Sequence, residues 1–236
     1  MKGFIKIDNA IFTEVNRLNQ KEFFVWSFLV IMSRGSEEFF YFRMKDLIDR
    51  ANKSDDYVLK YSDKDSKVLK LTDKRIIAKT LNGLMEKGYI INTDGVSFEE
   101  YSALDLLDIR ILIRAGEDKF NIISEQLFKD YMGIIGYQGW VIYCYLNKNY
   151  NKDKGYSFPS LSDIDNNCNC ATKTTVAYLN LLEEVGLIKI KSNKEYNMSQ
   201  IAKGGINDSL GNSKVKLKNN EYIVFAKVEG DKYYIV

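Results

Sequence analysis

The residues that most often perform chemistry in enzymes are absent or scattered in this chain. No histidine occurs among its 236 residues, so the commonest general base and the commonest metal ligand are both missing. The three cysteines, Cys144, Cys168 and Cys170, have no apparent fourth ligand for a thiolate metal site, and packing of reduced thiols is the favoured interpretation. Asp63 and Asp65 lack the rest of a calcium loop. The sequence therefore predicts no catalytic residue, no metal site and no cofactor.

Side chains suited to binding are more evident than side chains suited to catalysis. The net charge is only +2, from 34 basic and 32 acidic residues, so contact with nucleic acid would depend on local patches. The candidates for DNA contact are Thr172, Lys173, Thr174, Thr175, Tyr178, Lys189, Lys191, Lys214, Lys216 and Lys218 in the second half of the chain, and Lys74, Arg75 and Lys79 in the first half.

Each group of candidates suggests a particular contact. Thr172, Lys173, Thr175 and Tyr178 are expected to be exposed and to meet base edges, whereas Thr174 is expected to pack or to meet a phosphate. Arg75 could form a bidentate contact with guanine. An ordinary solvated helix face is the alternative interpretation of the charges in the first half.

Lysines that alternate along a strand point to one side of it. Lys189 and Lys191 alternate with Ile188 and Ile190, and the lysines from Lys214 to Lys218 repeat the arrangement. Such a stripe suits the phosphate backbone and gives salt-dependent affinity with little sequence preference. Lysines also protect edge strands from aggregation, which is the alternative interpretation.

The elements that would position these side chains form a pattern that occurs twice. Both copies have an extended apolar opening with Phe at its first and ninth places, then an apolar helix, then a short second helix, which Ser160 caps in the second copy. The two openings are Phe4 to Phe12 and Phe120 to Phe128; the first helices are Leu18 to Arg34 and Gly136 to Asn149; the second helices are Met44 to Asn52 and Ser160 to Cys168.

The third segments, Leu71 to Ile90 and Asn169 to Ile188, align without a gap. In both, leucines three residues apart bury one helix face, and Gly88 or Gly186 ends the helix. Strands follow at Tyr89 to Asn92 and Leu187 to Lys191, with expected partners at Val96 to Phe98 and Tyr222 to Val228.

Three helices followed by a hairpin make a winged helix. We therefore predict an α+β fold with two tandem winged-helix domains, each a three-helix bundle with a β-hairpin wing, and a C-terminal β-hairpin around Glu229 to Asp231. The expected domains are residues 1–98 with an insert at 53–70, and residues 120–236 with a long wing loop at 192–221. A structured linker, 99–119, is expected between them, with a strand where Ile109 and Ile111 alternate with Arg110.

A resemblance to known proteins follows from these motifs. The segment SFPSLSDI and the segment ATKTTVAYLNLLEEVGLIKI, Ala171 to Ile190, resemble the helix-turn-helix of bacterial and plasmid winged-helix proteins. In that superfamily a threonine opens the recognition helix and Leu-Glu-x-x-Gly-Leu-Ile closes it. Two winged helices preceded by an extended apolar strand are similar in layout to plasmid replication initiators. This resemblance implies binding of repeated origin sites, self-association as a homodimer and recruitment of host replication proteins.

The leading functional hypothesis is binding of double-stranded DNA without chemistry on it, in replication initiation or its control on a plasmid, phage or other mobile element. A transcriptional regulator of the same fold is the first alternative. The second is a protein-docking subunit, similar to the winged-helix subunits that attach to the kleisin of bacterial condensins; the near-neutral charge and tyrosine-rich apolar segments favour it. The apolar runs are too short to span a membrane, so we expect a cytoplasmic protein without membrane partners.

Overall fold

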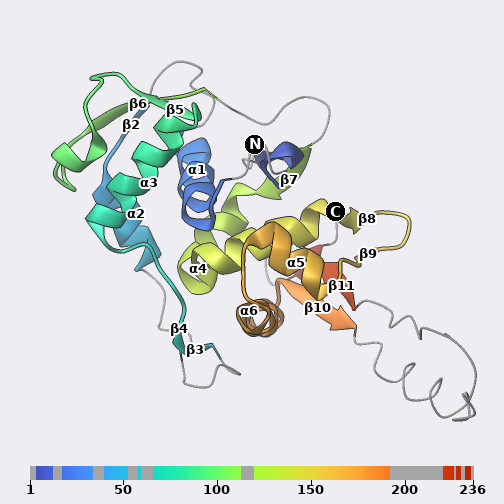
Figure 1. The fold of residues 1–236 in the computed structure, drawn as a ribbon. Coiled ribbons are helices and arrows are strands. Elements are labelled where there is room, and N and C mark those ends of the chain that lie inside the picture. The colour runs from blue at the N-terminus through green and yellow to red at the C-terminus, as the bar shows by residue number, and fades with distance from the viewer. Residues whose placement is uncertain are drawn as a thin grey trace, which may run out of the picture.

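The computed structural model of the chain describes residues 4–12, 18–33, 40–52, 58–59, 66–112, 120–191, 220–225, 227–229 and 232–234 (Figure 1). These residues form two units, each with three helices and a small antiparallel sheet, and helices α1 and α4 lie beside each other at their junction. Within the described residues no helix is long and apolar enough to cross a membrane.

The first unit begins with strand β1 (Phe4–Asp8) and the short helix η1 (Asn9–Phe12). It continues with α1 (Gln20–Met32), β2 (Phe40–Phe42), α2 (Met44–Ala51), α3 (Lys74–Glu86), β5 (Ile90–Asn92), η2 (Phe98–Glu100) and β6 (Leu107–Ile111). Between α2 and α3, β3 (Val58–Leu59) and β4 (Ser66–Lys67) pair within the predicted insert.

The second unit contains β7 (Phe120–Ser124), α4 (Glu125–Lys148), β8 (Tyr150–Asn151), β9 (Tyr156–Ser157), α5 (Leu161–Cys168), α6 (Thr172–Glu184), β10 (Ile188–Lys191) and β11 (Glu221–Val224). The predicted C-terminal hairpin is confirmed as β12 (Lys227–Glu229) paired with β13 (Lys232–Tyr234).

The sheets of the two units have the same strand order. In the first unit the order is β2-β6-β5, and in the second it is β9-β11-β10, with β8 added beside β9. In both units the strand between the first and second helices therefore pairs with the last strand, which pairs in turn with the strand that follows the third helix.

The two repeat openings pair with each other. Strands β1 and β7 are antiparallel, and Lys6 lies opposite Ile122, which occupies the same place in the second copy of the repeat. The pairing is therefore locally two-fold symmetric, as in a contact between two identical surfaces. The two units share this sheet rather than forming separate bodies joined by a flexible linker.

The core continues through the junction between α1 and α4. Trp140 of α4 is fully buried and its indole Nε1–H donates a hydrogen bond to Ser27 Oγ of α1 at 3.0 Å, which satisfies the polar atom that burial would otherwise leave unpaired. The rings of Phe24 and Phe128 meet at a centroid distance of 5.5 Å.

A sharp kink divides α4 at Gly136, where φ is 61° and ψ is −170°. The backbone oxygen of Leu69 and the side chain of Val68 fill the space where a Cβ atom would stand. The end of the predicted insert thus packs against the second unit, at a place that only glycine allows.

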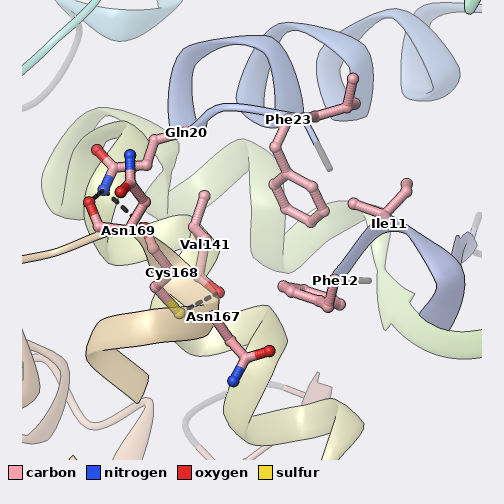
Figure 2. A pocket seen from close by; sticks show the side chains of 9 residues that line it. Ile11, Phe12, Gln20, Phe23, Val141, Asn167, Cys168 and Asn169 are labelled. Atoms are coloured by element: carbon pink, nitrogen blue, oxygen red, sulfur yellow. Dashed lines mark hydrogen bonds between the residues drawn. The ribbon is translucent and has the colours of Figure 1, made fainter. Parts of the chain in front are cut away.

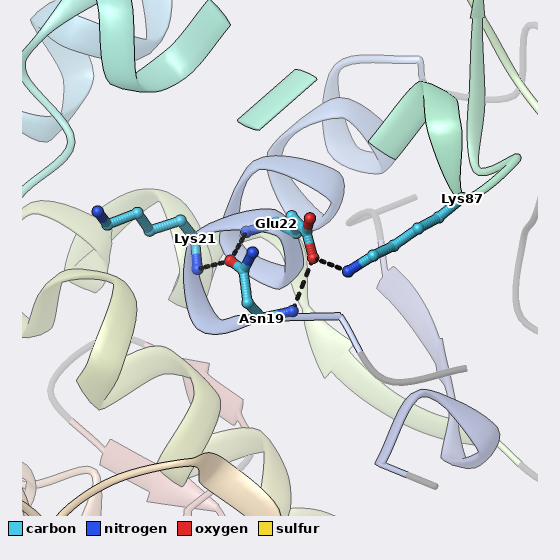
Figure 3. Close-up of polar contacts among 4 residues, drawn as sticks. All are labelled: Asn19, Lys21, Glu22 and Lys87. Atoms are coloured by element: carbon cyan, nitrogen blue, oxygen red, sulfur yellow. Dashed lines mark hydrogen bonds and ion pairs between the residues drawn. The ribbon is translucent and has the colours of Figure 1, made fainter. Parts of the chain in front are cut away.

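The start of α1 is fixed to the end of α3 (Figure 3). Asn19 Oδ1 accepts hydrogen bonds from the backbone N–H groups of Lys21 and Glu22. In turn, Glu22 Oε2 accepts a hydrogen bond from the backbone N–H of Asn19. This is a capping box. The buried Glu22 carboxylate also pairs with Lys87 Nζ at 2.5 Å, so one side chain caps α1 and holds the third helix.

Several local predictions are confirmed. Ser160 caps α5 through its hydroxyl, which accepts from Asp163 N at 3.0 Å. Gly88 and Gly186 follow the ends of α3 and α6 with φ of 73° and 76°, as expected for left-handed helix stops.

Two strand predictions are wrong. Val96 to Phe98 is not the partner of β5, because the fully buried Phe98 begins η2 against α3; the partner is β6, which lies within the segment 99–119 that was expected to be a linker. The expected extended opening Phe120 to Phe128 ends at Ser124, since α4 begins at Glu125. The first opening, Phe4 to Phe12, also stays extended for only five residues, since η1 begins at Asn9.

Candidate nucleic-acid interface

The second and third helices of the second unit are joined by a three-residue turn, Asn169 to Ala171. Asn169 adopts a left-handed conformation with φ of 53°, which asparagine tolerates better than most residues. The Asp165 carboxylate of α5 accepts hydrogen bonds from the hydroxyls of Thr172 and Thr175, both on α6. This bridge fixes the angle between the two helices and places a negative charge near the N-terminus of α6, where the helix dipole favours it.

One face of α6 is exposed along its length. Lys173 is exposed, Val176 is 36% exposed and Asn180 is half-buried, and these positions follow the three- and four-residue spacing of a single helix face. Asparagine can bind adenine through the oxygen and the NH2 group of its side-chain amide, and Val176 could contact a thymine methyl. Sequence reasoning missed Val176 and Asn180, although their spacing from Lys173 would have identified them.

Two predicted base-contacting residues are buried, so the prediction that they are exposed is wrong. Thr175 is fully buried, and its hydroxyl donates a hydrogen bond to Asp165. Tyr178 is fully buried, and its hydroxyl accepts a hydrogen bond from Leu69 N of the first unit at 3.2 Å; burial raises the pKa of Tyr178 well above the usual value. Thr172 is exposed and Thr174 is half-buried.

The strand after α6 presents lysines as predicted. Lys189 and Lys191 are exposed, Ile188 is buried and Ile190 is half-buried. The backbone N–H of Ile190 donates to Glu183 Oε1 at 2.8 Å, which ties β10 to the end of α6. Lys214, Lys216 and Lys218 lie outside the described residues.

The N-terminal end of α1 in the first unit contacts the turn between α5 and α6 in the second unit (Figure 2). Gln20, the first residue of α1, donates through Nε2 to the carbonyl oxygens of Cys168 and Asn169, both at 2.8 Å, and to Cys170 Sγ at 3.1 Å. A small pocket beside this contact is walled by apolar side chains of both units, among them Phe12, Phe23 and Val141. The position of the turn therefore depends on the first unit.

The cysteines do not assemble a metal site among the described residues. Cys144 and Cys168 are buried, which fits the predicted packing role, and Cys170 is half-buried beside Gln20. Burial, with a contribution from the nearby negative charge of Asp165, raises the pKa of the Cys170 thiol to about 11. The thiol is therefore neutral near pH 7.

The third helix of the first unit is covered in part by the segment between β5 and β6. Asn82 of α3 donates to Ser97 Oγ at 2.9 Å and accepts from Phe98 N at 3.0 Å, while Lys74 Nζ donates to the carbonyl oxygen of Glu99 at 2.8 Å. These contacts hold η2 against α3. Lys74 is thus bound within the protein, whereas Arg75 and Lys79, the other predicted DNA-binding residues here, are exposed.

Equivalent positions in the two units have different chemistry. The gapless alignment of the third segments places Ile91 and Thr93 where the second unit has Lys189 and Lys191. Residues Thr93 to Leu106 between β5 and β6 include four acidic residues and no lysine or arginine. The segment between β5 and β6 is therefore unsuited to a phosphate backbone.

Comparison with known families agrees with the geometry of the second unit. Residues 141–188 match the family model of a helix-turn-helix domain, a segment that runs from α4 through α5, the turn and α6 to the start of β10. No curated protein and no solved structure matches the chain. The matched segment contains the exposed face of α6 and suggests DNA as a partner.

Proposed function

We propose that the protein binds double-stranded DNA through its second unit, with α6 in the major groove and β10 along the phosphate backbone. The observation that carries the proposal is the exposed face of Lys173, Val176 and Asn180 within the segment that matches a helix-turn-helix domain. A major groove admits an α-helix whose exposed side chains reach base edges. Lys189 and Lys191 would supply contacts that are independent of sequence.

We propose further that both units are winged helices in tandem. The support is the shared strand order and the shared succession of helix, strand, two helices and two strands. The same arrangement underlies the likeness in layout to plasmid replication initiators, so we propose replication initiation or its control on a mobile element as the process, with homodimers and host replication proteins as partners. A transcriptional regulator would use the same surface, and neither role needs a catalytic step.

Protein docking is a second function for the first unit alone. The loop between β5 and β6 is acidic and exposes Leu104 to 66% and Leu106 to 56%. Its charge would repel DNA, whereas exposed leucines within an acidic loop suit a protein partner. In this proposal the second unit binds DNA and the first unit holds it in place and faces another protein.

The experiment compares three proteins of full length. Two lysines of the second unit are reversed in Lys173→Glu/Lys189→Glu, and two charges of the first unit are reversed in Arg75→Glu/Lys79→Glu. Both variants change the net charge equally, so a general effect of charge would appear in both. Binding to labelled random duplex DNA is measured by fluorescence anisotropy over a range of salt concentrations.

We expect tight, salt-sensitive binding by the wild type and a large loss only in the variant of the second unit. If both lysines contact phosphates, the slope of log affinity against log salt should fall by about 1.8, at about 0.9 for each contact. Absence of duplex binding at low salt, or equal losses in the two variants, would contradict the proposed use of the second unit.

A further inference from the structure

A second open surface of the second unit lies at the N-terminal end of α5, apart from the exposed face of α6. It is a groove of about 360 Å³, open to solvent, lined by Tyr145, Asn149, Phe158, Pro159 and Asp163. The residues come from the end of α4, from the segment after β9 and from α5. None of them belongs to the DNA-contacting residues proposed above.

The walls of this groove are aromatic. Phe158 is 43% exposed although it is a large apolar side chain, and Tyr145 and Pro159 are buried behind it. Tyr156 contacts the Phe158 ring edge to face at a centroid distance of 6.1 Å, which holds the ring in place. An exposed ring fixed in this way is suited to stacking with a flat ligand.

The polar groups of the groove are acceptors. Asp163 Oδ2 accepts from the backbone N–H and the hydroxyl of Ser160, and in the described part of the chain no donor contacts Oδ1. The contacts with Ser160 lower the pKa of Asp163, so it is ionised at neutral pH. Asn149 donates its amide N–H to the carbonyl oxygen of Tyr145 and offers its side-chain oxygen as an acceptor.

We infer that this groove binds a guanine base. The ligand must be flat, and its edge must supply hydrogen-bond donors to Asp163 and Asn149. Guanine carries a ring N–H beside an exocyclic amine, so it presents two adjacent donors on one edge, as no other common base does. Proteins bind unpaired bases in this way, by stacking on aromatic side chains and hydrogen bonding to the Watson–Crick edge.

A lysine lies where the phosphate of a nucleotide could reach it. Lys154 Nζ is 4.6 Å from the centroid of the Phe158 ring. A base that stacks on this face would displace the ammonium group towards its own phosphate. The groove therefore has a partner for each part of a guanine nucleotide: a ring for stacking, acceptors for the base edge and a cation for the phosphate.

The same base chemistry has two sources, a free guanine nucleotide and an unpaired guanine in DNA. Calorimetric titration with guanosine and adenosine 5′-monophosphates tests the first source. Anisotropy with labelled duplexes that carry one unpaired guanine, one unpaired adenine or no unpaired base tests the second. The proteins are the wild type, Phe158→Ala, Phe158→Trp, Asp163→Asn and, as a control at an exposed aromatic residue of the first unit, Tyr41→Ala, each checked for folding by circular dichroism.

We expect a preference for guanine in at least one arm, and the arm in which it appears identifies the source. Phe158→Ala should weaken guanine binding about 10-fold or more through loss of stacking, and Phe158→Trp should retain it. Asp163→Asn keeps an acceptor for Ser160 but should reduce the preference for guanine over adenine by about 10-fold. Tyr41→Ala should bind like the wild type.

Equal binding of guanine and adenine in both arms would overturn the inference, as would a guanine preference that persists in Phe158→Ala and Asp163→Asn. The inference deepens the proposed function and rests on it only for the DNA source. The duplex without an unpaired base distinguishes failure of this inference from failure of the proposed function. If the protein binds that duplex normally but shows no preference for guanine, this inference fails and the proposed function stands.

Discussion

Replacing Gly136 with alanine tests the packing of the two units against each other. At φ 61° and ψ −170° an L-residue is strained by about 1–3 kcal/mol. An added Cβ would lie 2.4 Å from Leu69 O and 2.8 Å from Val68 Cγ1, and the backbone oxygen cannot move without moving the segment before α3. Overpacking of this kind costs a further 1–3 kcal/mol or so. We expect Gly136→Ala to lower the free energy of unfolding by about 4 kcal/mol.

The assay is urea unfolding followed by tryptophan fluorescence, with Gly95→Ala as the matched control. Gly95 also has a positive φ, 68°, but no atom lies within 4 Å of an added Cβ, so its substitution should cost only about 1–2 kcal/mol. The midpoint should shift much further for Gly136→Ala than for Gly95→Ala. If the two variants lose the same stability within about 1 kcal/mol, the close contact of residues 68–69 with α4 does not exist in solution.

Two further predictions concern Tyr178 and Cys170, which lie near the turn between α5 and α6. Tyr178→Phe removes the hydroxyl that accepts from Leu69 N and leaves that N–H unpaired, so it should lower the free energy of unfolding by about 1–2 kcal/mol in urea titrations. DNA affinity should not change at temperatures where the variant is folded. A loss of affinity would mean that Tyr178 contacts DNA after all. The pKa of Cys170 is about 11, against 9.0 for an ordinary thiol, so its thiolate fraction at pH 8 is about 100-fold lower. Alkylation of Cys170 by iodoacetamide, measured by mass spectrometry, should therefore be about 100-fold slower than alkylation of free cysteine. The rate should increase with pH up to about pH 11. Fast modification at pH 8 would contradict the burial of this thiol.

The sequence was most informative where local rules decide the structure. Leucine spacing located α3 and α6, the serine cap located α5, and the glycine stops ended the third helices correctly. Alternation of Ile188 and Lys189 predicted which side chains of β10 face outward. These features depend on neighbours within a few residues, which periodicity and capping preferences describe well.

Predictions failed where distant residues decide the structure. Tyr178 lies on the predicted helix, yet its hydroxyl accepts a hydrogen bond from the backbone N–H of Leu69, which is 109 residues away in the sequence. Lys74 was predicted to contact DNA or to lie on a solvated helix face, but its ammonium group donates to the carbonyl oxygen of Glu99 in the segment between β5 and β6. The turn Thr93 to Gly95 also suggested a short hairpin after β5, but Phe98 is fully buried and begins η2, which packs against α3.

Pairing between β1 and β7 has a consequence for synthesis of the chain. β1 is complete once Asp8 has been added, but its partner begins only at Phe120. At about 5–20 residues per second, a ribosome needs about 6–20 s to make the intervening segment. Throughout that time the edge of β1 has no partner strand from the second unit, and Ile7, fully buried in the finished protein, lacks part of its cover. Of the described strands, β1 is made first but can pair with β7 only after the whole first unit has been made, and until then its edge is open to pairing with another strand.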